Sequence, residues 1–183
     1  MKPNPAPPPE GSPRWAEAVR LFVASACGLG LLPIAPGSFG ALLGVVAHVA
    51  VAFWAPPNVQ WVSLVLILLA VSAAHIALTP WSQARWHSLD PKNFVLDEVA
   101  GYLVVPILFH RGPLWKTAFC GFLLFRILDV IKVPPARQID RDTHGAWGIL
   151  LDDIVSGLYA VGCLYAMDWV FLRLSGAPLF TPV

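Results

Sequence analysis

The chain has 183 residues, of which 57% are hydrophobic and 13% are charged, and its formal net charge is +1. A soluble domain is about a quarter charged, so this composition indicates an integral membrane protein. The near-zero net charge excludes a broad basic surface for nucleic acid. The three cysteines lie in apolar stretches, form no CxxC motif and are odd in number, which argues against a disulfide framework.

The first thirteen residues, MKPNPAPPPEGSP, contain six prolines. Proline cannot donate a helical hydrogen bond, and this segment has nothing to bury, so we expect a disordered tail over residues 1–13. Residues 14–183 are expected to form one membrane domain. The segment that opens it, RWAEAVRLFVASACGLGLL, is amphipathic at first and then apolar, which predicts an interfacial helix. Whether residues 21–32 enter the bilayer stays open.

Five apolar segments follow, and crossing a bilayer takes about 20 apolar residues, or about 17 at the short end. The third segment is short and carries Asp97 and Glu98. The pattern predicts an all-α fold: a polytopic membrane bundle of about five transmembrane helices plus the interfacial N-terminal helix. The predicted spans are residues 39–55, 59–78, 94–109, 114–131 and 154–174.

The charges of the links predict the orientation in the membrane. Five crossings place the N-terminal tail and the two longer links, residues 79–93 and 132–153, on the same side. The positive-inside rule makes that side cytoplasmic, because it collects most of the basic residues. They are Lys2, Arg14, Arg20, Arg85, Lys92, Lys132, Arg137 and Arg141, against Arg111, Lys116 and Arg173 on the other side.

The same topology brings acidic residues from three spans to one depth. A carboxylate inside a span costs about 2.5–3.5 kcal/mol on insertion scales, so such groups usually face a partner or a cavity. Asp168, near the outer end of the last span, has no acidic companion and is not assigned to this cluster. The cluster consists of Asp97 and Glu98 at the start of the third span, Asp129 at the end of the fourth, and Asp152 and Asp153, which are expected to open the fifth.

Adjacent carboxylates repel each other unless a cation binds them. Clustered carboxylate oxygens suit a hard ion such as Mg²⁺, which also takes phosphate oxygens as ligands. The alternative is that the paired acids only stabilise helix N-termini, where the macrodipole favours negative charge. The candidate metal-binding and catalytic residues are Asp97, Glu98, Asp129, Asp152 and Asp153.

Basic and backbone groups near the cluster are candidates for binding a phosphate. Arg126 lies three residues before Asp129, so the two share a helix face and form either a local ion pair or a phosphate-and-metal pair. Ser38 is expected to cap the first span, and Gly37 lets backbone N–H groups approach an anion, unless this is only a turn into the membrane. The phosphate-binding candidates are Gly37, Ser38, Arg126, Lys132, Arg141 and His144, the last of which can also shuttle a proton.

Three blocks of the chain resemble the phosphatidylglycerophosphatase A family of bacterial lipid phosphatases. They are GLLPIAPGSFGAL (30–42), DPKNFVLDEVAG (90–101) and FRILDVIKVPPARQIDRDTHGAWGILLDDIVSG (125–157), about a third of the chain in family order. The last block is long and specific. Two positions depart from the usual family pattern: Val133 stands where a proline is usual after the lysine, and Ser38 where threonine is usual.

The resemblance implies a Mg²⁺-dependent phosphomonoesterase. It would convert phosphatidylglycerophosphate to phosphatidylglycerol as a multi-pass protein of the bacterial inner membrane, with its site on the cytoplasmic face and with membrane lipids, not nucleic acid, as partners. The oligomeric state stays open. Carried over onto matching positions, the acidic candidates are Asp90, Asp97, Glu98, Asp129, Asp140, Asp152 and Asp153, and the basic ones are Arg126, Lys132 and Arg141.

Two questions stay open at the level of sequence. Attack on the phosphate can come from water activated by the metal or from a carboxylate that forms an aspartyl-phosphate. A cation transporter or channel would also place acids at membrane depth, but it would distribute them through the spans, whereas the first two spans contain none. A non-enzymatic scaffold would not need paired carboxylates beside basic residues.

Overall fold

The computed structural model describes residues 13–142 and 145–181, apart from the side chains of residues 140–142. All the regular structure in these ranges is helical, which confirms the predicted all-α class. The elements are α1 (Arg14–Ala24), the 3₁₀ helix η1 (Leu29–Leu31), α2 (Pro36–Trp54), α3 (Pro57–Trp86), α4 (Leu96–Leu108), α5 (Leu114–Ile131), α6 (Ala136–Asp142) and α7 (Ala146–Ser175). All but residue 13 of the predicted tail lies outside the described residues.

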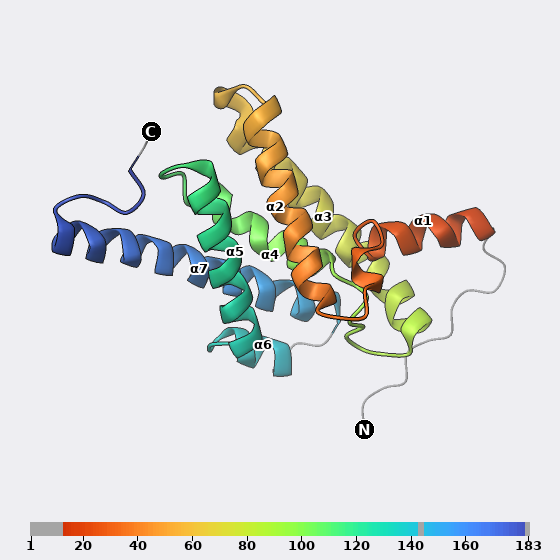
Figure 1. Cartoon of the computed structure of the whole chain (residues 1–183). Helices are drawn as coiled ribbons and strands as arrows, with labels where there is room; N and C mark the ends of the chain where they lie inside the picture. The colour runs from red at the N-terminus through yellow and green to blue at the C-terminus, as the bar shows by residue number, and fades with distance from the viewer. Residues whose placement is uncertain (1–12, 143–144, 182–183) are drawn as a thin grey trace.

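The short helix α4 forms the centre of the bundle. It packs against α2, α3, α5 and α7, which surround it in Figure 1. Eleven of its 13 residues are buried. At 1.5 Å per residue, α4 is about 20 Å long, shorter than the bilayer core of about 30 Å. It is therefore a core helix enclosed by its neighbours.

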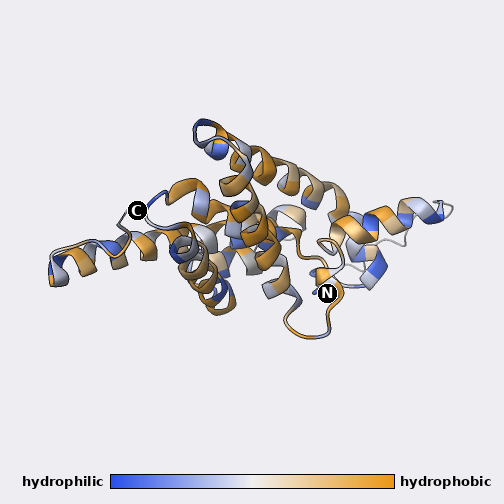
Figure 2. Ribbon diagram, turned by 45° about the horizontal axis from the view of Figure 1, so that its top comes forward, coloured by the Kyte–Doolittle hydropathy of each residue, from blue (hydrophilic) through white to orange (hydrophobic). Residues whose placement is uncertain are grey.

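Three helices, α2, α3 and α7, are long and apolar enough to cross a membrane. The predicted count of about five spans is not confirmed. The third predicted span corresponds to α4, which is too short. The fourth corresponds to α5, which has 18 residues but carries Lys116, Arg126 and Asp129. Figure 2 shows hydrophobic residues along most of the bundle and hydrophilic residues concentrated near helix ends and turns.

The helix α7, which like α3 has 30 residues, begins earlier than predicted. It starts at Ala146, directly after Gly145 with φ +90°, so the last eight residues of the predicted link 132–153 belong to α7. Asp152 and Asp153 therefore lie in the second turn of α7, and its first turn contains no acidic residue. The expectation that this pair opens the helix was wrong, and its role as a stabiliser of the helix N-terminus is excluded with it.

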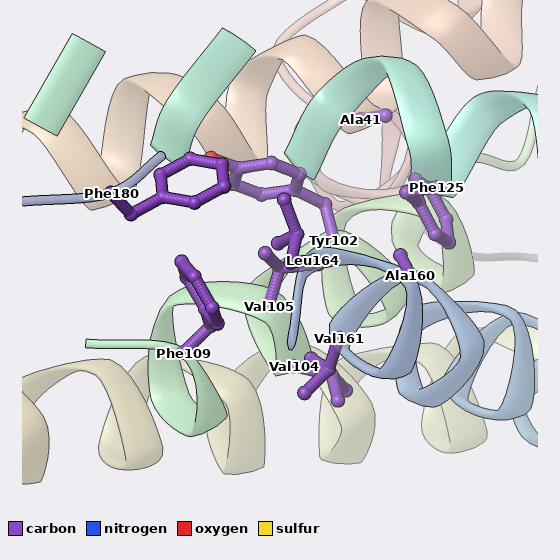
Figure 3. Packing of buried hydrophobic residues seen from close by; sticks show 10 residues of the cluster. All are labelled: Ala41, Tyr102, Val104, Val105, Phe109, Phe125, Ala160, Val161, Leu164 and Phe180. Atoms are coloured by element: carbon purple, nitrogen blue, oxygen red, sulfur yellow. The ribbon is translucent and has the colours of Figure 1, made fainter. Parts of the chain in front are cut away.

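The backbones of α7 and α4 pack in close contact. A Cβ atom on Gly157 would collide with the carbonyl oxygen of Gly101, so only glycine allows the two helices to approach this closely. Beyond this contact the core is apolar, with Val104, Val161 and Leu164 packed between the helices (Figure 3). The contact fixes the depth of the acidic turn of α7 relative to the start of α4.

The N-terminal helix α1 is amphipathic, as predicted. Trp15, Val19 and Phe22 are exposed apolar residues, whereas Glu17 accepts a hydrogen bond of 3.1 Å from the Trp81 indole of α3. The chain then turns through η1, so residues 21–32 do not form one continuous helix. In Figure 1, α1 lies beside the end of α3 and away from α7.

Candidate active site

Acidic side chains from three helices meet at one end of the bundle. They line a cavity of about 300 Å³ that lies between the starts of α2, α4 and α7 and the end of α5. Of the candidates predicted from sequence, the described residues that line it are Gly37, Asp90, Asp97, Glu98, Arg126, Asp129, Lys132, Asp152 and Asp153.

Three of these carboxylates are close enough to share one ion. Glu98 of α4, Asp129 of α5 and Asp153 of α7 each offer an oxygen, and these oxygens lie within 4.8 Å of one another. Asp129 and Asp153 are buried, and Glu98 is half-buried. Because each ligand comes from a different helix, the fold itself assembles the cluster.

Arg126 is in contact with this cluster. Its guanidinium donates through Nη1 to the Glu98 carboxylate and, at 2.9 Å, to Asp129 Oδ2. The local ion pair between residues 126 and 129 is thus present and extends to α4. Only 16% of the Arg126 side chain is exposed, and its buried Nε has no hydrogen-bond partner among the described residues. This N–H group therefore still has a hydrogen bond to donate.

Lys132 ends α5 in a left-handed conformation, with φ +50°. Its Nζ lies 2.7 Å from Asp152 Oδ2 of α7. Asp152 is buried, so the pair joins the end of α5 to the acidic turn of α7. The two neighbouring aspartates of α7 thus have different partners, because Asp153 lies beside Glu98 and Asp129 instead.

Asp97 contributes a buried carboxylate with one unsatisfied oxygen, because its Oδ1 atom has no hydrogen-bond partner among the described residues. A buried carboxylate oxygen without a partner is costly, so it is normally hydrogen-bonded, paired or bound to a cation. Asp97 lines the same cavity as the three-carboxylate cluster.

The charges around the cavity do not balance. Its described lining residues include six acids and three bases, a formal difference of three negative charges when all of them are ionised. An anionic phosphate would be repelled unless a cation compensated this excess. The acids are Asp90, Asp97, Glu98, Asp129, Asp152 and Asp153, and the bases are Lys92, Arg126 and Lys132.

The start of α2 differs from the prediction at Ser38. The helix begins at Pro36, and its N-cap is Ala35, with φ +48° and no side-chain cap hydrogen bond. Proline is well suited to the first helical position, so Ser38 falls inside the helix, does not cap it and does not line the described cavity.

Gly37 does line the cavity, and it has a clear steric role. A Cβ atom there would collide with Oε1 of Glu98 and would lie 3.2 Å from Nη2 of Arg126. Glycine therefore lets the first turn of α2 approach the carboxylates directly.

Two predicted phosphate-binding residues remain untested. His144 lies outside the described residues, and the Arg141 side chain is likewise not described, although its backbone belongs to α6. Sequence reasoning also missed one charged lining residue: Lys92 was used only to predict the orientation of the membrane spans. Its position in the DPKNFVLDE block, five residues before Asp97, was the available signal.

The comparisons agree with the resemblance found in the sequence. Residues 22–168 match the model of a family described as phosphatidylglycerophosphatase A. The chain is 34% identical over 140 residues to the phosphatidylglycerophosphatase A of Escherichia coli K12, an alignment that covers 75% of this chain and 77% of that protein. It is 27% identical over 148 residues to the phosphatidylglycerophosphatase A of Haemophilus influenzae, covering 79% and 86%.

A third relative carries a different name. It is a protein of Bacteroides thetaiotaomicron, named provisionally as a phosphatidylinositol-3-phosphatase, and it is 27% identical over 156 residues, which cover 82% of this chain and 94% of the relative. No solved structure matches the chain. The family and the relatives are therefore identified by similarity of sequence.

Proposed function

Because the chain belongs to the phosphatidylglycerophosphatase A family, we propose that it hydrolyses the terminal phosphate monoester of phosphatidylglycerophosphate, giving phosphatidylglycerol and phosphate. The observation that carries the proposal is the meeting of Glu98, Asp129 and Asp153 beside the cations Arg126 and Lys132. Phosphate monoester hydrolysis requires charge neutralisation and a positioned nucleophile, and this site contains groups for both.

The donor set fits Mg²⁺. All the candidate ligands are carboxylate oxygens, which this hard ion prefers, and a cation is also what the excess negative charge of the cavity requires. Glu98, Asp129 and Asp153 would hold it, with Asp97 and Asp152 next to them. When bound, the ion would polarise the phosphate and lower the pKa of a coordinated water.

The basic residues would then bind the substrate. Arg126 is paired with Glu98 and Asp129, and a cation on these carboxylates would weaken that pairing and make its N–H groups available to phosphate oxygens. Lys132, at the end of the same helix α5 and paired with Asp152 of α7, would place a second positive charge on the phosphate. Arg141 and His144 remain further candidates from the charged link.

In this proposal Asp97 either activates the nucleophile or is the nucleophile. Its unpaired Oδ1 atom would accept the proton of the attacking water, or the carboxylate would itself attack phosphorus. The two routes differ in whether a phosphoenzyme forms. Rapid quenching during turnover of ³²P-labelled substrate separates them, because only the covalent route leaves label on the protein.

We further propose that the protein is a multi-pass protein of the bacterial inner membrane with its site at the cytoplasmic face. The cavity is formed at the starts of α2, α4 and α7 and the end of α5, the helix ends that the positive-inside rule assigns to the cytoplasm. Five crossings would include α4 and α5 beside the three longer apolar helices.

The transporter alternative lacks support. α2 and α3 contain no acidic residue along their length, so the acids do not form a series across the membrane. A phosphoinositide is a more specific second candidate, because the Bacteroides relative is named for one. Both lipids present a phosphate monoester, so the same cluster suits either.

The test is phosphate release by the purified protein in detergent micelles. Phosphatidylglycerophosphate and phosphatidylinositol 3-phosphate are supplied separately, each with Mg²⁺ and then with a chelator. We expect release from phosphatidylglycerophosphate in Mg²⁺ and its loss with chelator. Equal phosphate release with Mg²⁺ and with chelator would exclude a role of the metal in the reaction. Faster release from phosphatidylinositol 3-phosphate would make the phosphoinositide the preferred substrate.

A further inference from the structure

Lys92 differs from the other two cations that line the active-site cavity. Arg126 and Lys132 are partly buried and form ion pairs with acids of the site. Lys92 is exposed, and among the described residues it has neither an ion-pair nor a hydrogen-bond partner. Its charge is therefore the one least compensated by the protein.

The backbone that carries Lys92 is held in place by its neighbours. Asn93 donates a side-chain hydrogen bond of 2.9 Å to the carbonyl of Gly30, and the N–H group of Val95 donates at 3.3 Å to the carbonyl of Ala24. Phe94 is buried and also lines the cavity. The backbone of Lys92 is therefore held beside the cavity, while its exposed side chain stays free to adjust.

The proposed substrate carries two phosphates. The monoester at the end of the headgroup is the one that is hydrolysed, and the diester that joins the headgroup to diacylglycerol keeps one negative charge. With the monoester among the buried acids Asp129 and Asp153, the diester must lie nearer the mouth, because the acyl chains remain outside the cavity. The exposed position of Lys92 matches that part of the substrate.

We propose that Lys92 binds the diester phosphate and is a specificity-determining residue, which favours lipids with two phosphates over simple lipid phosphate monoesters. A lysine ammonium is a point charge with rotatable donors, suited to a phosphate whose exact position varies with the lipid. The inference rests on the proposed function, and it adds a recognition step that is separate from the chemistry at the buried acids.

Lys92→Met tests this step, because it keeps most of the side-chain volume and removes the charge. We expect KM for phosphatidylglycerophosphate to rise about three- to fivefold, the effect of one exposed ion pair, with kcat changed less than about twofold. Phosphatidate, which has a monoester but no diester, is measured as a competitive inhibitor, so that no turnover is needed. Its inhibition constant should stay the same, and Lys92→Arg should restore the wild-type KM.

Arg85→Met is the matched control. Arg85 is an exposed cation near the same end of the bundle, in the last turn of α3, and it does not line the cavity. Arg85→Met should leave KM for phosphatidylglycerophosphate unchanged. The inference is overturned if Arg85→Met raises KM as much as Lys92→Met, if Lys92→Met weakens phosphatidate equally, or if it lowers kcat alone. Absence of wild-type activity on phosphatidylglycerophosphate would instead reject the proposed function, and the inference with it.

Discussion

Asp168 of α7 accepts a hydrogen bond of 2.9 Å from the backbone N–H of Phe180 and so holds the end of the chain against the bundle. Its second oxygen lies 3.2 Å from Nη1 of Arg111. Phe180 is buried against Phe109, with ring centroids 5.0 Å apart. The acid without acidic companions is therefore a structural residue at the end of the bundle opposite the site.

This arrangement predicts a loss of stability without a loss of chemistry. Asp168→Asn keeps an oxygen for the Phe180 N–H but removes the charge that attracts Arg111. We expect a lower free energy of unfolding, by about 1 kcal/mol, because a charge-assisted hydrogen bond becomes a neutral one. Thermal unfolding in detergent measures the change, and kcat/KM at a permissive temperature should remain near normal. A large loss of kcat/KM in folded protein would mean that the two ends of α7 are coupled.

Asp153→Asn should behave in the opposite way. Asparagine keeps the shape and one carbonyl ligand but removes a charge that a hard cation needs. We expect turnover to fall more than about a hundredfold, beyond the usual loss from an outer-shell partner, with thermal stability equal or higher in the absence of metal because repulsion is relieved. Phosphate release over a Mg²⁺ titration is the measurement. Wild-type turnover with an unchanged Mg²⁺ midpoint would exclude Asp153 as a ligand.

Gly37→Ala should impair the site through a single methyl group. The new Cβ would collide with the Glu98 carboxylate, so either the carboxylate or the first turn of α2 must move. We expect at least about a tenfold loss of kcat/KM, since misplacement of about 1 Å can cost a hundredfold. Gly162→Ala is the control, because its Cβ has no atom within 4 Å and alanine is about 1 kcal/mol better than glycine in a helix. Equal activity of the two variants would show that this contact does not position Glu98.

The proposed orientation can be tested with single cysteines. In a background in which Cys27, Cys120 and Cys163 are replaced, cysteine is placed at Asn58 or at Arg137, both exposed positions. An impermeant thiol reagent applied to intact cells should label position 58 and not position 137. The reverse pattern would place the acidic cavity on the outer face.

The sequence predicts the gathering of the acids better than it predicts the helix ends. The turns that carry Glu98, Asp129 and Asp153 lie at one end of the bundle, as the predicted alternation of helix directions requires, and that alternation does not depend on where each helix begins. The position of Ser38 does depend on it: a proline at the first helical position moves the serine inside the helix. The early start of α7 was missed because the segment before Asp152 is not a long apolar run.

The ion-pair and hydrogen-bond partners of a side chain depend on its direction, which the sequence does not predict. The spacing of Arg126 and Asp129 predicts a possible ion pair, but only the packing of α5 on α4 shows that Glu98 joins it. Lys92 carries no periodic signal, since it lies in a loop whose course depends on contacts with Gly30 and Ala24. Asp168 looks isolated in sequence because its partners lie in the α4–α5 loop and at the end of the chain.

The enclosure of α4 separates the two acids that it carries, Asp97 and Glu98, from changes in the thickness of the lipid bilayer. Helices that face lipid respond to bilayer thickness by tilting, at a modest cost per ångström of mismatch. α4, with eleven of 13 residues buried, has little surface on which the acyl chains can act, whereas the 30-residue α3 has much more. Thickness changes would therefore be absorbed mainly by the outer helices, and Asp97 and Glu98 would keep their places while the membrane around them is remodelled by the lipids that the enzyme itself helps to make.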